Sequence, residues 1–146
     1  IREGFAAVQW PGRFEVLGNH PVFLLDGSHN PQGIAATADS LRELFPEQKF
    51  VFLLSIMADK DVDTMLSTLA PLAQQCFTVA ADNPRATPPA VLAEKLQELG
   101  CQAESCASIP EAVAAAQGAA GYDGRVCALG TLYFSGDVRR AFFRSL

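Results

Sequence analysis

The sequence predicts an α/β fold in which a mostly parallel β-sheet carries helices on both faces. Continuous apolar runs of strand length recur at residues 22–25, 50–56, 77–81 and 126–129. Runs without polar alternation are typical of strands that are covered on both faces. Segments with apolar residues at helical spacing separate these runs, and such alternation favours right-handed crossovers between parallel strands.

An antiparallel hairpin is expected at one edge of this sheet. Residues 13–17 alternate polar and apolar side chains more than the other runs do. The short segment Gly18-Asn19-His20-Pro21 then leads into the run at 22–25. Alternation is typical of a strand with one solvated face, and a short turn suffices to join antiparallel strands.

Three helices are expected between the apolar runs, each with apolar residues at helical spacing. The first follows Pro31, and the second follows Asp61 with an apolar stripe from Val62 to Ala73. The third follows Pro89.

Two further helices are expected in the last third of the chain. One begins at Ser108, which forms a capping-box pattern with Glu111, and Gly118 and Gly121 end it. The other covers residues 135–146, where arginines near the end suit the helix dipole. Together these elements predict a Rossmann-like domain.

Composition excludes several classes of function. The chain has 146 residues, 49% of them hydrophobic, and a formal net charge of −5, so it can bury a core of its own. A pI near 4.9 without a basic stripe argues against nucleic-acid binding and favours small-molecule partners. No apolar run approaches the roughly 20 residues of a membrane span, and we expect a cytoplasmic location.

Missing motifs narrow the chemistry further. The sequence contains no G-x-x-x-x-G-K-[ST] phosphate loop, no G-x-G-x-x-G fingerprint and no G-x-S-x-G nucleophile elbow. His20 and His29 lack the spacing of a helix-borne metal pair, so no metal is expected in this domain. The four cysteines form no C-x-x-C pair, and we expect all of them to be buried free thiols: Cys76, Cys101, Cys106 and Cys127.

Ligands of open parallel sheets bind beyond the carboxyl ends of the strands, so the loops at those ends are the candidate site. The loop at residues 26–31 combines the Asp26 carboxylate with Ser28, His29 and the start of a helix. Helix N–H groups attract phosphate, and a carboxylate can accept hydrogen bonds from ribose. The alternative interpretation is a polar turn in which Asn30 caps the helix and His29 is solvated.

Three other loops carry the same ambiguity. Lys60 lies between two acidic residues, which form either a binding site or a solvated helix cap. Arg85 could hold an anion, although its proline-rich loop equally serves as a rigid turn. The loop at 130–136 offers hydroxyl and N–H groups to a carboxylate, or else packs as a turn.

Four strings in this order and spacing resemble the C-terminal domain of folylpolyglutamate synthases, members of the Mur ligase superfamily. The bifunctional dihydrofolate synthase/folylpolyglutamate synthases of bacteria are the most similar, and the resemblance covers essentially the whole chain. The strings are Trp10-Pro11-Gly12-Arg13-Phe14-Glu15, Leu24-Leu25-Asp26-Gly27-Ser28-His29-Asn30-Pro31, Ala58-Asp59-Lys60-Asp61 and Gly130-Thr131-Leu132-Tyr133.

The resemblance implies an ATP-dependent ligase that works through an acyl phosphate. A folate carboxylate, and in bifunctional enzymes that of dihydropteroate, is phosphorylated by ATP and then joined to L-glutamate. The phosphate loop and the Mg²⁺ ligands would lie in a central ATPase domain N-terminal to this sequence. Residues 1–9 would then be a remnant of the interdomain linker and 10–146 the glutamate-ligase domain, inactive by itself.

The resemblance also implies roles for individual residues. Arg13 would contact the ATP phosphates and Asp26 the ATP ribose. Four further residues would line the cleft towards the central domain: His29, Asn30, Lys60 and Thr131. Among them, His29 would contact glutamate or phosphate, and Thr131 would take part in glutamate binding. Thr131 stands where the family often has Ser, and no residue of this domain is assigned a catalytic role.

Two rival functions remain open at this point. A Mur-type ligase would add an amino acid to a cell-wall precursor with the same chemistry, and substrate competition would distinguish it. A non-catalytic module would use the 26–31 loop to hold a nucleotide or a protein, and an upstream phosphate loop in the reading frame would argue against it.

Overall fold

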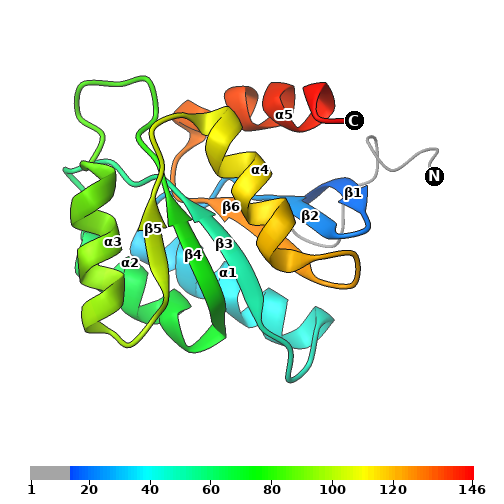
Figure 1. Cartoon of the computed structure of the whole chain (residues 1–146). Helices are drawn as coiled ribbons and strands as arrows, with labels where there is room; N and C mark the ends of the chain where they lie inside the picture. Colours follow the sequence, from blue (N-terminus) through cyan, green and yellow to red (C-terminus); the bar gives the residue numbers. More distant parts are fainter. Residues whose placement is uncertain (1–13) are drawn as a thin grey trace.

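The computed structural model describes residues 14–146 and contains a six-stranded sheet with the order β1-β2-β6-β3-β4-β5 (Figure 1). β1 pairs antiparallel with β2, and every other neighbouring pair is parallel. The predicted fold class and edge hairpin are therefore confirmed. The strands are β1 (Glu15–Asn19), β2 (Val22–Leu25), β3 (Phe50–Leu54), β4 (Ala73–Thr78), β5 (Ala103–Ser105) and β6 (Arg125–Leu129).

Side-chain caps start three of the five helices where the sequence predicts them. Asn30 Oδ1 accepts a hydrogen bond from the Gly33 N–H at 2.7 Å, and Ser108 Oγ accepts one from the Glu111 N–H at 3.2 Å. Asp61 Oδ1 caps the second helix in the same way. The helices are α1 (Pro31–Leu44), α2 (Val62–Leu69), α3 (Pro89–Glu98), α4 (Ile109–Ala120) and α5 (Ser135–Arg144), with 3₁₀ turns η2 (Ala70–Leu72) and η3 (Leu132–Phe134).

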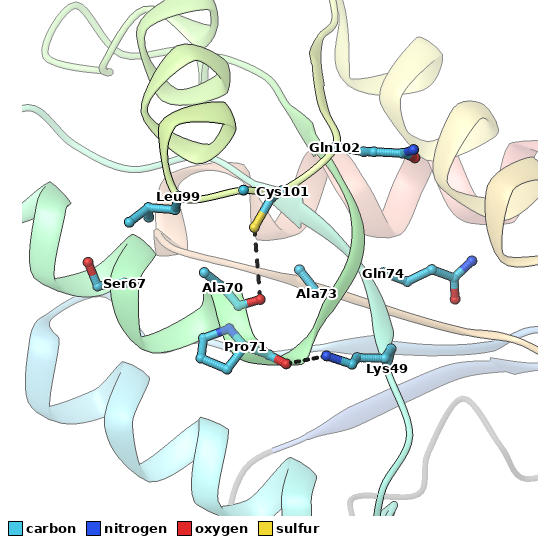
Figure 2. A pocket seen from close by; sticks show the side chains of 10 residues that line it. Lys49, Ser67, Ala70, Pro71, Ala73, Gln74, Leu99, Cys101 and Gln102 are labelled. Atoms are coloured by element: carbon cyan, nitrogen blue, oxygen red, sulfur yellow. Dashed lines mark hydrogen bonds between the residues drawn. The ribbon is translucent and has the colours of Figure 1, made fainter.

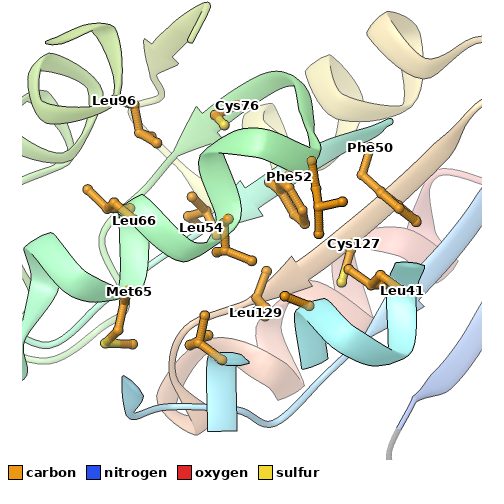
Figure 3. Close-up of a cluster of buried hydrophobic side chains, with 14 of the residues drawn as sticks. Leu41, Phe50, Phe52, Leu54, Met65, Leu66, Cys76, Leu96, Cys127 and Leu129 are labelled. Atoms are coloured by element: carbon orange, nitrogen blue, oxygen red, sulfur yellow. The ribbon is translucent and has the colours of Figure 1, made fainter. Parts of the chain in front are cut away.

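Two apolar clusters cover the two faces of the sheet. Phe50, Phe52 and Leu54 of β3 face the cluster beneath α1, α2 and α3 (Figure 3). Val51 and Leu53 face the other cluster, beneath α4 and α5. All five side chains of β3 are fully buried, as expected for a central strand whose successive residues point to opposite faces. This double covering leaves the ends of the sheet as the accessible part of the fold.

Several element boundaries differ from the prediction. The helical stripe ends earlier than predicted because Pro71 lies in the 3₁₀ turn η2, and Ala73 opens strand β4 instead of extending a helix. α4 continues through Gly118 and ends at Gly121, which has φ 72°. β5 was not predicted, because only Ala103 of its three residues is buried.

The four cysteines are free, and three of them are buried as predicted. Cys101 is the exception, since it is only half-buried. Burial raises the pKa of the Cys76 thiol to about 12, and it also raises the pKa of Cys127 well above its usual range. Within residues 14–146, none of the helices is long and apolar enough to span a membrane.

Candidate functional site

The loops that leave the carboxyl ends of β2, β3, β4 and β6 meet at one end of the sheet (Figure 1). Together they enclose a pocket of about 400 Å³. This location agrees with the rule that ligands of open α/β sheets bind at the carboxyl edge. The pocket is lined by His29, Met57, Asp59, Lys60, Arg85, Thr131, Leu132 and Tyr133.

Asp26 directly follows β2, and its carboxylate is almost fully buried at 1% exposure. Oδ2 accepts hydrogen bonds from the Ser28 N–H at 3.0 Å and from the Thr37 hydroxyl at 2.9 Å. Within the described part of the chain, Oδ1 is buried and has no hydrogen-bond partner. Asp26 therefore organises the loop with one oxygen and keeps the other unused. Its contact with an ATP ribose stays a prediction.

The loop at residues 26–31 was interpreted either as a binding site or as a capped turn, and His29 and Asn30 differ in their positions in it. The Asn30 side chain caps α1, which is the role that the turn interpretation assigns to it. His29 is exposed and lines the pocket. Its Nδ1 lies 3.1 Å from the Gly27 carbonyl oxygen, and because a carbonyl only accepts, Nδ1 carries the proton in this contact. Among the described residues, Nε2 has no hydrogen-bond partner.

Lys60 and Arg85 bring two cationic side chains to the same pocket. Arg85 Nη1 lies 3.3 Å from Asp59 Oδ2, so this guanidinium already has one carboxylate neighbour. The half-buried Lys60 forms no ion pair with any carboxylate in residues 14–146. The pocket thus offers an anionic ligand one uncommitted ammonium group and one guanidinium.

Thr131 lies where β6 ends, and it is buried at 2% exposure. Its Oγ1 accepts a hydrogen bond from the Tyr133 N–H at 3.1 Å, which leaves its own O–H free to donate. Leu132 and Tyr133 remain 60% and 56% exposed and form an apolar rim. Thr131 thus lies among the pocket residues and also caps the turn η3, so its contact with glutamate stays a prediction.

The sequence predicted part of this constellation. His29, Lys60 and Thr131 were candidates, and the structure brings all three into one pocket. Asn30 and Asp26 flank the pocket without lining it. Arg13 lies outside the described residues. A group of three His, Cys, Asp or Glu side chains suited to a metal ion is not found among residues 14–146.

The apolar rim and the acidic partner of Arg85 were missed. Leu132 and Tyr133 follow a buried strand directly, and two large apolar side chains in such a loop are a signal for a surface that is covered in use. Asp59 was considered only as a neighbour of Lys60 and not as a partner of Arg85. Its contact with Arg85 joins loops 26 residues apart in sequence, which periodicity cannot reveal.

A second hollow, of about 600 Å³, lies at the opposite, amino edge of the sheet (Figure 2). Two of its polar side chains are engaged with neighbouring backbone. Lys49 Nζ donates to the Pro71 carbonyl at 2.7 Å, and Cys101 Sγ lies 3.8 Å from the Ala70 carbonyl oxygen. No motif in the sequence indicates a site at this edge.

Comparison with known proteins identifies what the chain resembles. The family described as "Mur ligase, glutamate ligase domain" matches residues 12–132. A protein of Haloferax volcanii named "Probable bifunctional folylpolyglutamate synthase/dihydropteroate synthase" is 33% identical over 147 residues, covering 100% of this chain and 17% of that protein. A dihydrofolate synthase/folylpolyglutamate synthase of Bacillus subtilis is 29% identical over 142 residues, covering 96% of this chain and 32% of the relative.

A solved structure agrees with the sequence matches. The folylpolyglutamate synthase of Mycobacterium tuberculosis, complexed with ADP, superimposes with a TM-score of 0.81 at 29% identity. The match covers 95% of this chain and 34% of that one. The chain therefore spans about a third or less of the length of the relatives that it matches.

Proposed function

The chain belongs to the Mur ligase family through its glutamate ligase domain, and from this premise we propose that it serves as the C-terminal domain of an ATP-dependent ligase that adds L-glutamate to folates. One observation carries the proposal. His29, Lys60 and Thr131, which come from three separate motifs of folylpolyglutamate synthases, line one pocket at the carboxyl edge. The similarity of the chain to such synthases over nearly its whole length supports the same substrate class.

The proposed reaction has two steps. A folate carboxylate oxygen attacks the γ-phosphorus of ATP, ADP leaves, and an acyl phosphate forms. The amine nitrogen of L-glutamate then attacks the acyl carbon, inorganic phosphate leaves, and an amide bond forms. The glutamate ammonium group must lose a proton before it can attack. A domain that binds glutamate therefore has to hold its carboxylates and leave its nitrogen free to approach.

The pocket residues suit the binding of a carboxylate. The Lys60 ammonium group is a charged donor without an ion-pair partner among the described residues, and the Thr131 hydroxyl has a proton to donate. In the neutral tautomer that has its proton on Nδ1, His29 can accept at Nε2 a hydrogen bond from the amino group of the substrate. We assign these three side chains to glutamate.

Nucleotide contacts are proposed for the residues beside the pocket. Arg13 would offset charge on the ATP phosphates, and Asp26 would bind the ribose through its unused Oδ1. Asn30 fixes the start of α1, whose free N–H groups face the cleft in this proposal. The relative from Mycobacterium tuberculosis was solved as a complex with ADP, which supports a nucleotide at this fold.

The remaining parts of the reaction are assigned to other domains of the same enzyme. Residues 14–146 contain no cluster of three His, Cys, Asp or Glu side chains suited to a metal ion, and the proposal assigns Mg²⁺ to the central ATPase domain. In this proposal residues 1–9 are linker and 10–146 the ligase domain. Closing the cleft between the two domains would assemble the site, and the domain alone would be inactive. The cytoplasmic location stays a prediction.

Phosphate release from ATP tests the proposal with the full-length polypeptide that contains this sequence. The assay compares a reduced folate, dihydropteroate and a cell-wall precursor as acceptors, each with and without L-glutamate. We expect release that requires both L-glutamate and a pterin acceptor, and the dihydropteroate arm reports whether the enzyme is bifunctional. Release with the cell-wall precursor alone would favour a Mur-type ligase, and release with none would overturn ligase function.

A further inference from the structure

We propose that Cys76 and Cys101 are a redox-active pair, which a small-molecule disulfide converts into a reversible disulfide bond at the amino edge of the sheet. The pair lies at the end of the sheet opposite the ligand pocket, and the inference does not depend on the proposed function. The two residues are far apart in the sequence, so only the fold brings them together. Three features support the pairing: the backbone around the two residues, their unequal exposure, and their effect on each other.

The backbone directs both side chains to the same face of the sheet. Cys76 on β4 pairs with Ala103 on β5, and its N–H donates to the Gln102 carbonyl at 2.9 Å. Cys101 lies two residues before Ala103, and both pack in the apolar cluster that contains Cys76. Gln102 between them is exposed. Every second residue of an extended segment points to one face, so Cys101 points to the side of the sheet where Cys76 lies.

The turn that ends α3 leaves room for Cys101 to move. The Cys101 N–H donates to the Leu96 carbonyl at 3.0 Å, which ties the residue to the last turn of the helix. Gly100 precedes it with φ 90°, and a Cβ at Gly100 would meet nothing within 4 Å. A disulfide needs the two sulfur atoms to come within about 2 Å of each other. The open turn can make this adjustment without displacing side chains of the core.

The two thiols differ in how easily a reagent can reach them. Cys76 is fully buried, whereas Cys101 is half-buried and lines the amino-edge hollow of about 600 Å³. The Cys101 sulfur points toward the Ala70 carbonyl at the wall of this hollow (Figure 2). A small molecule that enters the hollow therefore meets Cys101 first. Cys76 can react only after Cys101, from behind it.

Each thiol shifts the pKa of the other. The pKa of Cys76 rises to about 12, chiefly because of burial and then because of the neighbouring Cys101 thiol. Burial also raises the pKa of Cys101, while a hydrogen bond with Cys76 and the charge of Lys49 lower it. A hydrogen bond that lowers a pKa favours the ionised form of the acceptor, so Cys76 donates and Cys101 accepts. Of the two, Cys101 is thus the better placed to attack.

The proposed exchange takes two steps. The Cys101 thiol loses its proton to water, and its sulfur attacks one sulfur of the small disulfide, whose other half leaves as a thiol. The Cys76 sulfur, after losing its own proton, then attacks Cys101 Sγ and displaces the second half. Two protein thiols are oxidised to one disulfide, and the small disulfide is reduced to two thiols. Because burial keeps both protein thiols mostly protonated, the exchange should be slow.

The other two cysteines lie where neither can replace a member of the pair. Cys106 follows β5 but packs in the cluster on the opposite face of the sheet, beneath α4 and α5. Cys127 is fully buried on β6, and β3 separates that strand from β4. Cys106 is therefore the matched control for Cys101, since it is close in sequence and faces the other way.

The test incubates the full-length polypeptide that contains this sequence with excess oxidised glutathione, alkylates it and maps its cysteines by mass spectrometry. Trypsin combined with a glutamyl endopeptidase separates the two candidate thiols, because cleavage after Glu104 divides Cys101 from Cys106. We expect a cross-linked pair of peptides that joins residues 61–85 to residues 99–104 and is lost after reduction with dithiothreitol. The wild-type chain should lose two more thiols than Cys101→Ser does.

Variants separate the two steps. Cys76→Ala keeps the accessible thiol, and it should stop at a mixed disulfide with one glutathionyl group on Cys101. Cys106→Ser should form the bond as the wild-type chain does. A wild-type map in which Cys101 carries glutathione while Cys76 stays reduced, or in which Cys76 is joined to Cys106, would overturn the inference. The absence of any reaction at Cys101 would overturn it too. If Cys76→Ala fails to fold, the wild-type map decides.

Discussion

The two ends of the sheet carry hollows that differ in how their side chains are used. At the carboxyl edge, Lys60 and Arg85 face a pocket with charged groups that can still accept a ligand. At the amino edge, Lys49 and Cys101 lie against carbonyl groups of the neighbouring turn (Figure 2). The amino-edge hollow is the larger, at about 600 Å³ against about 400 Å³. Volume alone therefore does not identify the site.

The direction of the chain explains the difference. Strands of a parallel sheet all end at one edge, and the helices that follow them begin there with unpaired N–H groups. At the other edge the helices end with unpaired carbonyls, so a cation such as Lys49 is drawn to the Pro71 carbonyl. Lys49 at the amino edge thus completes the fold, while Lys60 at the carboxyl edge forms no ion pair among the described residues and can meet a ligand.

Two glycines, one at each edge, test this contrast most strongly. Gly130 has φ 120°, and a Cβ there would lie 2.1 Å from the Ser55 carbonyl oxygen, so backbone would have to move. Gly100 has φ 90°, but a Cβ there would meet nothing within 4 Å. We expect Gly130→Ala to lower the free energy of unfolding by more than about 3 kcal/mol, through strain and overpacking together. Gly100→Ala should cost about 1–2 kcal/mol.

Urea unfolding of the two glycine variants and the wild-type chain measures these costs. Equal losses for Gly130→Ala and Gly100→Ala would mean that the carboxyl edge can relax, and the geometry of its pocket would then not be rigid. In that case the two edges of the sheet would not differ in rigidity.

Two lysines, one at each edge of the sheet, compare the contributions of the two edges to activity. Lys60→Ala removes the uncommitted ammonium group from the pocket, and we expect kcat/KM for L-glutamate to fall by about 10- to 100-fold in the full-length enzyme. Lys49→Ala removes only a surface hydrogen bond to the Pro71 carbonyl and should change kcat/KM by less than about twofold. Steady-state kinetics with varied L-glutamate distinguishes them, and a larger loss in Lys49→Ala would reverse the assignment of the two edges.

Sequence reasoning predicted the elements and the useful edge of the sheet because both follow from local patterns. Unbroken apolar runs mark strands such as β3, whose five side chains are all buried. The Asn30 and Ser108 caps need only near neighbours in sequence. Once the strands are parallel, the loops after them must share one edge, so the meeting of His29, Lys60 and Thr131 could be anticipated.

Arg85 could not be assigned in the same way, because its position depends on contacts between loops. A short ladder of backbone hydrogen bonds joins residues 56–58 to residues 85–87. Nothing in either segment alone distinguishes this pairing from a turn rich in proline. β5 was missed for a related reason, since two of its three residues are exposed and only its pairing with β4 makes it a strand.

The buried carboxylate of Asp26 lies at the carboxyl edge but stabilises the loop there, so it tests whether a side chain at this edge can have a structural role. Asp26→Asn keeps an oxygen for the Ser28 N–H and the Thr37 hydroxyl but places an amide donor at the position of the unpartnered Oδ1. We expect the free energy of unfolding to fall by about 1–3 kcal/mol. Asp39→Asn, on an exposed ion pair, should cost less than about 0.5 kcal/mol.

Chemical denaturation of these two aspartate variants measures their free energies of unfolding. Nucleotide affinity in the full-length enzyme then reports whether Asp26 also contacts the ligand. If Asp26→Asn retains full stability but loses nucleotide affinity, the carboxylate serves the ligand alone. A loss of both would assign it to loop structure and ribose binding together.

The smallest effect concerns the thiols, which distinguish the amino-edge hollow from the core beneath it. Cys101 is half-buried and lines that hollow, whereas Cys127 is fully buried. The thiolate is the reactive form, and burial raises the pKa of Cys127 well above its usual range. At pH 8 we therefore expect iodoacetamide to modify Cys101 first and Cys127 only when the chain unfolds. Mass spectrometry of timed samples reports the order, and Cys101→Ser should abolish the early addition. Early modification of Cys127 would show that the sheet opens below α1 without global unfolding.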